Sequence, residues 1–342
     1  MPQAVIMAGG QGERFWPLTH KKYPKYRLRF GGKDSLLKAT YLRLLCVYKR
    51  KEVHVVTTND HAPMVRKELP GLFKENLILE PQRKNTAAAI LLCSAKIREK
   101  FGPKEVVSFF PADHLIRSIS SFKKTIRGAV GLARQQKVLV TVGIRPTFAA
   151  TGYGYIRTGK ALAKLPQAFK VDRFVEKPGA KTALGYFKQK KFLWNGGIFS
   201  WQSGVFLDAM KRVSPGYYRR FILNDIPGSY RRLPNISIDY ALLEKMDDLL
   251  VYTTSMDWCD LGSWGMVLEK SEKDPQGNSR LGKRVIFKDT HGSLLISSQV
   301  KTPLVVLGVS DLIVVQTKRG TLVCPKGRSE EAALLAKKIA PQ

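Results

Sequence analysis

The chain has 342 residues, of which 44% are hydrophobic and 10% aromatic, a composition typical of a globular protein and not of a disordered one. Its 58 lysines and arginines outnumber its 27 aspartates and glutamates, and the formal net charge of +31 would attract polyanions. The basic residues are spread in short runs along the whole chain, which favours a basic solvated surface over a dedicated nucleic-acid site. We therefore do not expect nucleic acid as the partner, and a nucleic-acid-binding module is kept only as an alternative.

The cysteines and the N-terminal segment indicate where in the cell the protein is expected to act. Cys46, Cys93, Cys259 and Cys324 are scattered without a Cys-x-x-Cys pair, which argues against a zinc site or a disulfide scaffold and fits a reducing cytoplasm. Met1–Gln3 has neither the basic segment nor the apolar core that begins a signal peptide, and no apolar run is long enough to span a bilayer. We expect a cytoplasmic protein that is not associated with membranes.

Buried strands alternate with helices from the start of the chain. The expected strands are Ala4–Met7, Val53–Thr57, Leu77–Leu79, Val106–Phe110 and Val138–Gly143. The expected helices lie near Ser35–Tyr48, Asn85–Lys100 and Ser120–Gln136, with Asn85 or Thr86 as a plausible N-cap. This alternation predicts an α/β fold, a Rossmann-like, mostly parallel sheet flanked by helices, whose ligands bind beyond the carboxyl ends of the strands.

The pattern changes after about Gly277. Short β-rich runs separated by turns follow, at 284–288, 293–297, 304–309, 312–316 and 321–324, and a helix is expected near Glu330–Ile339. Lys273–Asn278 is the expected linker. We therefore predict a large domain over residues 1–272 and a small β-rich C-terminal module with a terminal helix over residues 280–342.

A glycine-rich loop, Ala8–Thr19, follows the first strand, with Pro24 and Lys25 just beyond. Gly9, Gly10 and Gly12 allow a sharp turn and a close approach to a ligand, and exposed backbone N–H groups form an anion-binding concavity. Arg14 and Lys25 would add positive charge for phosphate oxygens. The sequence predicts a triphosphate-binding loop, against the alternative of a simple tight turn.

Two better-known glycine loops do not fit. A Walker A loop ends in Gly-Lys-Ser/Thr, which is absent, and a dinucleotide fingerprint needs a third glycine where this chain has Phe15.

Carboxylates accompany this loop. Asp113 closes a strand, and Asp260 lies in the segment Asp257–Trp264; two carboxylates near phosphates suggest Mg²⁺, although many aspartates at strand ends merely cap a turn. Glu176 and Lys177 stand at another strand end, either as a surface ion pair or as ligands of sugar hydroxyls and a phosphate. No Ser/His/Asp arrangement stands out and no cysteine has a matching histidine, which argues against a covalent nucleophile.

At this point the chain resembles the nucleoside-diphosphate-sugar pyrophosphorylase family, and within it the mannose-1-phosphate guanylyltransferase branch. The motifs run in family order from the start to about residue 265. They are Ala8–Thr19, Pro24–Lys25, Glu80–Pro81 with Asn85–Ala87, Phe110–His114, Thr151–Ile156, Phe174–Pro178, Trp194–Phe199, Ile236–Ala241 and Trp258–Trp264. The glycine loop alone marks only the superfamily, whereas the Glu80, Phe174 and Trp258 motifs narrow the resemblance to the mannose branch. The β-rich tail resembles the β-helix-like C-terminal module of the family.

The resemblance implies that GTP and mannose 1-phosphate react to give GDP-mannose and pyrophosphate, without a membrane. It implies that Asp113 and Asp260 hold Mg²⁺, that Arg14 and Lys25 grip the triphosphate, and that Lys177 binds the sugar phosphate. Nucleotide-binding residues would be Ala8, Gly9, Gly10, Gly12, Glu80, Pro81, Asn85 and Thr86; sugar-phosphate-binding residues would be Gly152, Gly154, Glu176, Lys177 and Asn195. Family analogy also favours a homodimer.

The choice of base has a physical explanation. Guanine presents two donors, N1–H and the 2-amino group, on one edge, and a carboxylate accepts both; we assign this role to Glu80. Two alternatives remain: a sister enzyme for another nucleotide or sugar phosphate, and a catalytically silent homologue that binds a nucleotide sugar.

Overall fold

The structure is a computed structural model that describes residues 1–10, 12–30, 32–163, 165–299, 301–336 and 338. The chain forms two compact units. The first contains Met1–Gly9 and Thr40–Cys259, and the second contains Gly10–Ala39 and Asp260–Gln342. The glycine loop therefore groups, from Gly10 onward, with the C-terminal part of the chain. The expected boundary between residues 272 and 280 stays a prediction.

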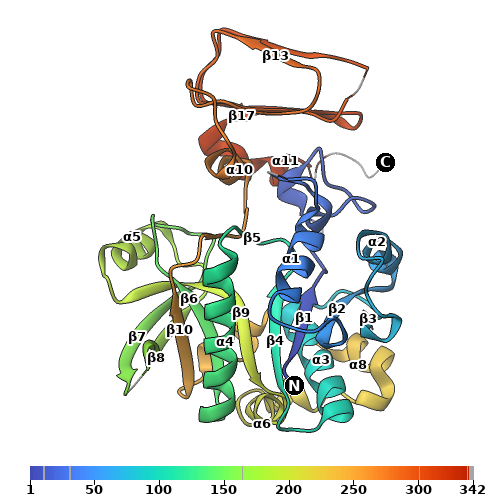
Figure 1. The fold of residues 1–342 in the computed structure, drawn as a ribbon, viewed down its shortest axis with the longest axis vertical. Helices are drawn as coiled ribbons and strands as arrows, with labels where there is room; N and C mark the ends of the chain where they lie inside the picture. Colours follow the sequence, from blue (N-terminus) through green and yellow to red (C-terminus); the bar gives the residue numbers. More distant parts are fainter. Residues whose placement is uncertain (11, 31, 164, 300, 337, 339–342) are drawn as a thin grey trace. The chain divides into compact units, whose positions relative to one another are not determined.

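The first unit is built on a nine-stranded sheet in the order β3-β2-β1-β4-β9-β6-β10-β8-β7 (Figure 1). Its strands are β1 Gln3–Met7, β2 Val53–Thr58, β3 Leu77–Glu80, β4 Val106–Pro111, β6 Leu139–Ile144, β7 Tyr155–Leu162, β8 Leu165–Val175, β9 Phe192–Gln202 and β10 Leu249–Thr254. The predicted strands are confirmed, and β1–β4 pair in parallel. The rest of the sheet is mixed, because β9 pairs antiparallel to β4, β6 and β7.

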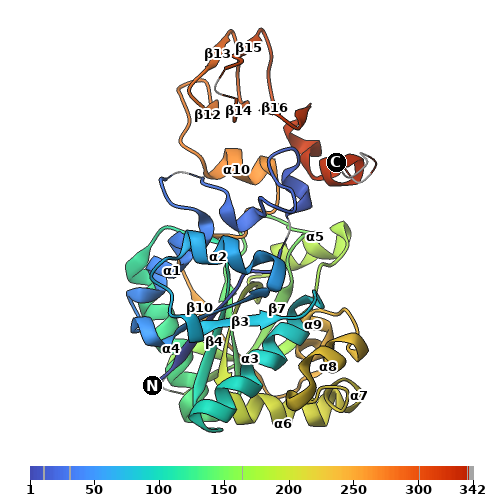
Figure 2. The ribbon, with the colours of Figure 1, turned by 90° about the vertical axis from the view of Figure 1, so that its right-hand side faces the viewer.

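Helices cover both faces of this sheet (Figures 1 and 2). Phe110 on β4 packs on Phe122 of α4, whereas its neighbour Phe109 packs on Trp201, whose indole N–H donates to Ser94 of α3. Successive strand residues point to opposite faces of the sheet, so α4 and α3 lie on opposite sides of it.

The helices of this unit are α2 Ala62–Glu68, α3 Asn85–Phe101, α4 Ile119–Gln136, α5 Ala180–Lys188, α6 Ser203–Val213, α7 Pro215–Tyr218, α8 Ile226–Arg232 and α9 Ile238–Ala241. Helix α1, Leu36–Leu45, begins in the second unit. A short pair, β5 Leu115–Ile116 with β11 Trp258–Cys259, completes the first unit.

The start of α3 differs from the sequence prediction. Its N-cap residue is Lys84, with no side-chain cap, so neither Asn85 nor Thr86 caps the helix. Asn85 has a φ of 64°, a left-handed conformation that asparagine tolerates, and its Oδ1 accepts the N–H of Thr86 at 2.8 Å. The Thr86 hydroxyl instead accepts the N–H of Ile238 at 2.9 Å, which ties α3 to α9.

The second unit contains α10 Trp264–Lys270 and the predicted β-rich module. Its strands are β12 Ser279–Leu281, β13 Val285–Lys288, β14 Leu294–Ser297, β15 Leu304–Leu307, β16 Leu312–Thr317 and β17 Gly320–Pro325. Parallel pairing of β12, β14 and β16, and of β13 with β15, stacks the chain as in a β-helix, with a small core that contains Leu295 and Val314. The closing helix is shorter than expected: α11 spans Ala332–Ala336 after a 3₁₀ turn, and the predicted end, Ile339, lies outside the described residues.

Candidate active site

The parallel strands deliver the predicted nucleotide-site residues to one edge of the first unit. Ala8 and Gly9 follow β1, Glu80 ends β3, and Asp113 follows β4. Because β1–β4 run in the same direction, their carboxyl ends share an edge, and this edge is where ligands bind in such sheets. Ala8 is fixed there, since its N–H donates to Val56 and its carbonyl accepts from the Thr57 hydroxyl.

Glu80 is a buried carboxylate beside the glycine loop. It is 5% exposed, and its Oε1 lies 4.0 Å from the position that a Cβ on Gly9 would occupy. The Tyr230 hydroxyl donates to Oε2 at 3.3 Å. Burial raises the pKa of Glu80 to about 7, against the lowering effects of the Tyr230 hydrogen bond and of the Arg83 charge. A carboxylate in this setting gains strongly from a ligand that brings hydrogen-bond donors.

The residues that follow Glu80 along the chain make further contacts. Arg83 donates to the carbonyl of Gly9, so the end of β1 is linked to the segment after β3. Pro81 is half-buried, whereas Asn85 is exposed. The Thr86 hydroxyl accepts the Ile238 N–H, so we assign Thr86 a structural contact as well as its predicted role.

The predicted sugar-binding residues form a second cluster around Asn195 on β9. The Asn195 amide donates to Asp239 at 3.0 Å, and its carbonyl oxygen accepts from the Thr141 hydroxyl and from the N–H of Gly197, both at 3.1 Å. These three partners fix the orientation of the side chain.

Gly154 brings the backbone against this cluster. A Cβ at Gly154 would lie 2.5 Å from Oε2 of Glu176 and 3.3 Å from Cβ of Asn195. The close approach of the backbone therefore requires glycine there. Gly152 is exposed, and a Cβ on it would have no heavy atom within 4 Å.

One lysine and several carboxylates meet in this cluster. Lys177 pairs with Oε1 of Glu176 at 2.7 Å, and the Glu176 N–H donates to Glu244 at 2.7 Å. Although partial burial lowers the pKa of Lys177, its hydrogen bond and charge pairing with Glu176 outweigh that effect and raise the pKa above its ordinary value. Burial, and then the Glu176 charge, raise the pKa of Asp239 well above its usual range. Sugar hydroxyls and a phosphate are the ligands that such donors and acceptors suit.

Asp113 lies on a segment that is held from two sides. The buried Arg43 of α1 donates to the carbonyls of Ile116 at 2.7 Å and of His114 at 3.3 Å. On the other side, the indole N–H of Trp258 donates to Nδ1 of His114 at 3.0 Å. Arg43 therefore positions the segment that carries Asp113.

The cationic residues of the predicted triphosphate loop gather within the second unit. Gly12 has a φ of 75°, and a Cβ on it would lie 2.4 Å from Cβ of Lys25. The Lys25 ammonium donates to the carbonyl of Asp260 at 2.6 Å. A Cβ at Gly262 would meet Oδ1 of Asp260 at 3.0 Å and a guanidinium nitrogen of Arg14 at 3.2 Å. Gly12, Arg14, Lys25 and Asp260 thus form one group.

This loop is supported by the C-terminal part of the same unit. The Trp264 ring packs edge-on to Phe15 at 4.9 Å, and its indole N–H donates to the carbonyl of Trp16 at 3.3 Å. A Cβ on Gly320 would lie 3.1 Å from the Trp16 ring. Gly10 is exposed, with no heavy atom within 4 Å of an added Cβ, and Gln11 lies outside the described residues.

The residues predicted to bind a metal are the two aspartates Asp113 and Asp260. Among the described residues, no group of three or more His, Cys, Asp and Glu side chains could hold a metal ion. The carboxylates of Asp113 and Asp260 carry the hard oxygen donors that a divalent cation such as Mg²⁺ prefers, and their role as metal ligands stays a prediction.

Several residues of these clusters were assigned no role from the sequence. Tyr230, Asp239 and Arg43 each contact a predicted site residue or its segment, and they come from α8, α9 and α1. Asp239 lies within the motif Ile236–Ala241, which could have drawn attention to it, whereas Tyr230 and Arg43 carry no local signal.

Comparisons with known proteins agree with this arrangement. The profile of the nucleotidyl transferase family matches residues 3–277, and that of the MannoseP isomerase/GMP-like beta-helix domain matches residues 283–335. A mannose-1-phosphate guanylyltransferase of Salmonella montevideo is 36% identical, over 98% of this chain and 73% of that protein. One of Escherichia coli is 34% identical, over 98% of this chain and 73% of that protein. A solved structure from Thermus thermophilus, described as a mannose-1-phosphate geranyltransferase, has a TM-score of 0.89 at 29% identity and covers 99% of both chains.

Proposed function

The chain belongs to the nucleotidyl transferase family, and from this premise we propose that it transfers GMP from GTP to mannose 1-phosphate. A phosphate oxygen of mannose 1-phosphate attacks the α-phosphorus of GTP, the bond from that phosphorus to the bridging oxygen of the β-phosphate breaks, and pyrophosphate leaves with the bond's electrons. GDP-mannose is the other product. In such transfers the protein mainly positions the reactants and stabilises charge.

The observation that carries this proposal is the buried carboxylate of Glu80 beside Gly9. In its ionised form it accepts N1–H and the 2-amino group of guanine, an arrangement that adenine and uracil do not offer. The Tyr230 hydroxyl holds Oε2 in place for this contact. A buried site that must satisfy its polar groups can reject the wrong partner by about 10⁴–10⁵.

The Asn195 cluster is the proposed binding site for the sugar. Glu176 and Asn195 would bind hydroxyls of mannose, with the backbone at Gly152 and Gly154 against the ring. Lys177 would bind the phosphate of mannose 1-phosphate, since its ammonium is held in this cluster by Glu176 at 2.7 Å. The raised pKa of Lys177 favours its charged form, as phosphate binding requires.

The triphosphate would bind the loop of the second unit. Backbone N–H groups near Gly10 and Gly12 would meet phosphate oxygens, with Arg14 and Lys25 adding charge. Asp113 and Asp260 would hold Mg²⁺. Nucleotidyltransferases generally use a divalent metal, which, when bound, draws charge from the phosphate oxygens and lowers the barrier to attack.

A substrate panel tests the reaction. Pyrophosphate release is measured with GTP, ATP, UTP or dTTP against mannose 1-phosphate or glucose 1-phosphate, in the presence of Mg²⁺. We expect release with GTP and mannose 1-phosphate above all other pairs. A preference for another pair would identify a sister enzyme, and no release with any pair would identify a binding protein; either result contradicts the proposal.

The carboxylates of the proposed metal site are tested separately. Replacing Asp113 or Asp260 by alanine should lower the rate by about 10²–10³ while circular dichroism stays unchanged. A double variant that turns over at the normal rate would contradict their role.

Location and assembly are also proposals. None of the helices in the described part of the chain is long and apolar enough to cross a membrane. Cys46, Cys93, Cys259 and Cys324 form no disulfide bond with one another, and we propose a reducing cytoplasm as the place of action. The homodimer expected by family analogy would be checked by sedimentation equilibrium.

A further inference from the structure

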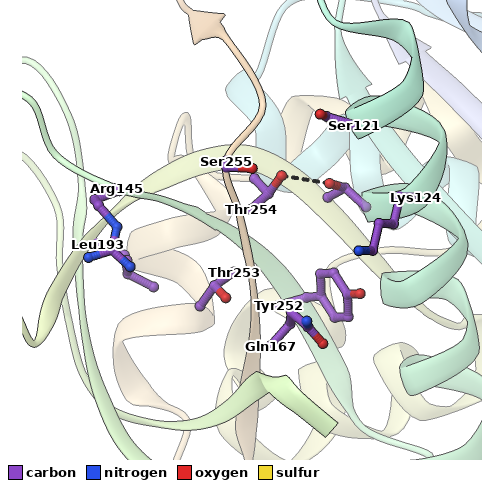
Figure 3. Close-up of a pocket in the computed structure, with 10 residues that line it drawn as sticks. Ser121, Lys124, Arg145, Gln167, Leu193, Tyr252, Thr253, Thr254 and Ser255 are labelled. Atoms are coloured by element: carbon purple, nitrogen blue, oxygen red, sulfur yellow. Dashed lines mark hydrogen bonds between the residues drawn. The ribbon is translucent and has the colours of Figure 1, made fainter.

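A polar cavity of about 270 Å³ opens in the first unit, apart from the Glu80 and Asn195 clusters (Figure 3). Its walls come from the first turns of α4, the carboxyl end of β10, the residue after β6 and one residue each of β8 and β9. Neither Glu80, Glu176, Asn195 nor Asp239 contributes to its lining. The proposed reaction therefore makes no use of this cavity.

The lining is cationic and rich in hydroxyls. Lys124 of α4 and Arg145 after β6 reach it from opposite sides, as Figure 3 shows. Ser121, Thr253 and Ser255 add hydroxyl groups, and Gln167 adds an amide. Among the lining residues that the structure describes, none is acidic. Both cations are exposed, and each can donate charge-assisted hydrogen bonds to an anion that enters the cavity.

The wall between α4 and β10 is firmly built. The hydroxyls of Thr125 and Thr254 hydrogen-bond at 2.6 Å, and the Met256 N–H donates to Thr254 at 3.1 Å. The Tyr252 ring lies flat against α4 at Gly128, where an added Cβ would be 2.3 Å from Cζ of the ring. The ring keeps this position, at the edge of the cavity, only because residue 128 has no side chain.

From this geometry we propose that the cavity is a second binding site, for a small phosphate monoester that carries sugar hydroxyls. The phosphate would lie between Lys124 and Arg145, which supply charge-assisted hydrogen bonds. The serine and threonine hydroxyls and the Gln167 amide would bind the hydroxyls of the ligand, because these groups both donate and accept. A neutral sugar would leave the two cations uncompensated, and an unhydroxylated anion would leave the polar wall unused.

The site is tested by calorimetric titration with glucose 6-phosphate, which has no phosphate at C1 and is no acceptor in the proposed reaction. Inorganic phosphate and glucose are titrated in parallel. We expect glucose 6-phosphate to bind more tightly than phosphate and glucose not to bind. Equal affinities for glucose 6-phosphate and phosphate would overturn the role of the hydroxyls, and absence of binding up to about 10 mM would overturn the site.

Two pairs of variants locate the binding. K124Q/R145Q should weaken glucose 6-phosphate binding by about 10-fold or more, because charge-assisted bonds are lost. The matched control R127Q/R134Q removes two exposed charges from the same helix but none from the lining, and should leave the affinity unchanged. Equal losses in both doubles would show general attraction to a basic surface and contradict the proposal.

The second pair changes shape and not charge. Gly128→Ala forces the Tyr252 ring from its place and should also weaken binding, whereas Gly131→Ala, with no heavy atom within 4 Å of the new Cβ, should not. Both substitutions gain similar helix propensity, so melting temperature reports any loss of fold. Finally, Lys177→Gln alters the proposed catalytic site and should keep glucose 6-phosphate binding; loss of binding in this variant would place the signal at the catalytic site and overturn the inference.

Discussion

The Glu80 cluster and the Asn195 cluster of the first unit both contain a glutamate, but the two glutamates have different surroundings. Glu80 lies at the end of the parallel strand β3, and its burial raises its pKa to about 7 although the neutral hydroxyl of Tyr230 donates to it. Glu176 follows the antiparallel strand β8 and is paired with a lysine at 2.7 Å. A buried carboxylate without a cation in direct contact has free capacity to accept hydrogen bonds from a ligand. A carboxylate paired with a lysine instead keeps both groups charged and in place for a charged ligand.

The largest effect is expected when the Asn195 cluster is changed and the Glu80 cluster is left intact. Lys177→Gln should lower kcat/KM for mannose 1-phosphate by about 10²–10³, because a charge that stabilises the phosphate is lost. The preference for GTP over UTP should stay unchanged. Steady-state kinetics with GTP and with UTP measures both quantities. An altered nucleotide preference would show that the two clusters do not act independently.

The reciprocal change is Glu80→Gln. We expect kcat/KM for GTP to fall by about 10–100-fold, because the amide cannot accept both guanine donors. The discrimination against UTP should shrink, while the ratio for mannose 1-phosphate over glucose 1-phosphate stays the same. Full preference for GTP in this variant would remove Glu80 from the proposed mechanism.

A smaller effect probes the backbone at the sugar cluster. Gly154→Ala should raise KM for mannose 1-phosphate by about 10-fold, since the new Cβ would lie 2.5 Å from the Glu176 carboxylate and must displace it. Gly185→Ala, on α5 and outside the proposed sugar site, is the matched control, because its Cβ meets no heavy atom within 4 Å. Equal KM values for the two variants would mean that the Glu176 position does not matter for sugar binding.

The smallest effect concerns stability. A carboxyl whose pKa is about 7 in the folded state, above its ordinary 4.5, keeps its proton longer when folded. The free energy of unfolding therefore falls as pH rises through this window, and Glu80→Gln should abolish that loss. Relative to the unaltered protein, we expect Glu80→Gln to gain on the order of 2 kcal/mol between pH 5 and pH 8 in urea unfolding. The exposed Glu75→Gln is the control and should gain nothing.

The sequence predicted the parallel half of the sheet better than the antiparallel half. Ala4–Met7 and Val106–Phe110 are short apolar runs between turn signals, and such runs identify buried strands. Strand β9 was not predicted, because Phe192–Gln202 mixes glycines, an amide and aromatics, and its place depends on three partner strands. Pairing of that kind is a property of the whole sheet and leaves no local pattern.

The candidate site shows the same division. Gly9, Glu80 and Asp113 could be predicted as site residues because strand ends and glycine loops have local signatures, and their roles stay predictions. Tyr230 was not predicted, because its contact with Glu80 joins residues 150 positions apart and the sequence around Tyr230 contains no pattern that indicates a buried partner. The left-handed Asn85 was misjudged as a cap for a related reason: asparagine serves both purposes, and only the surrounding fold decides which.

The supports of the glycine loop have a consequence for synthesis on the ribosome. Chains emerge from the N-terminus, yet Phe15 and Trp16 rest on Trp264 and Gly320, which are made about 250 to 300 residues later. The last strand of the first sheet, β10 Leu249–Thr254, is made shortly before Trp264 and well before Gly320. The loop would thus gain its full support only after residue 320 has left the ribosome, and stalled chains with C-terminal extensions of increasing length would reveal when activity appears.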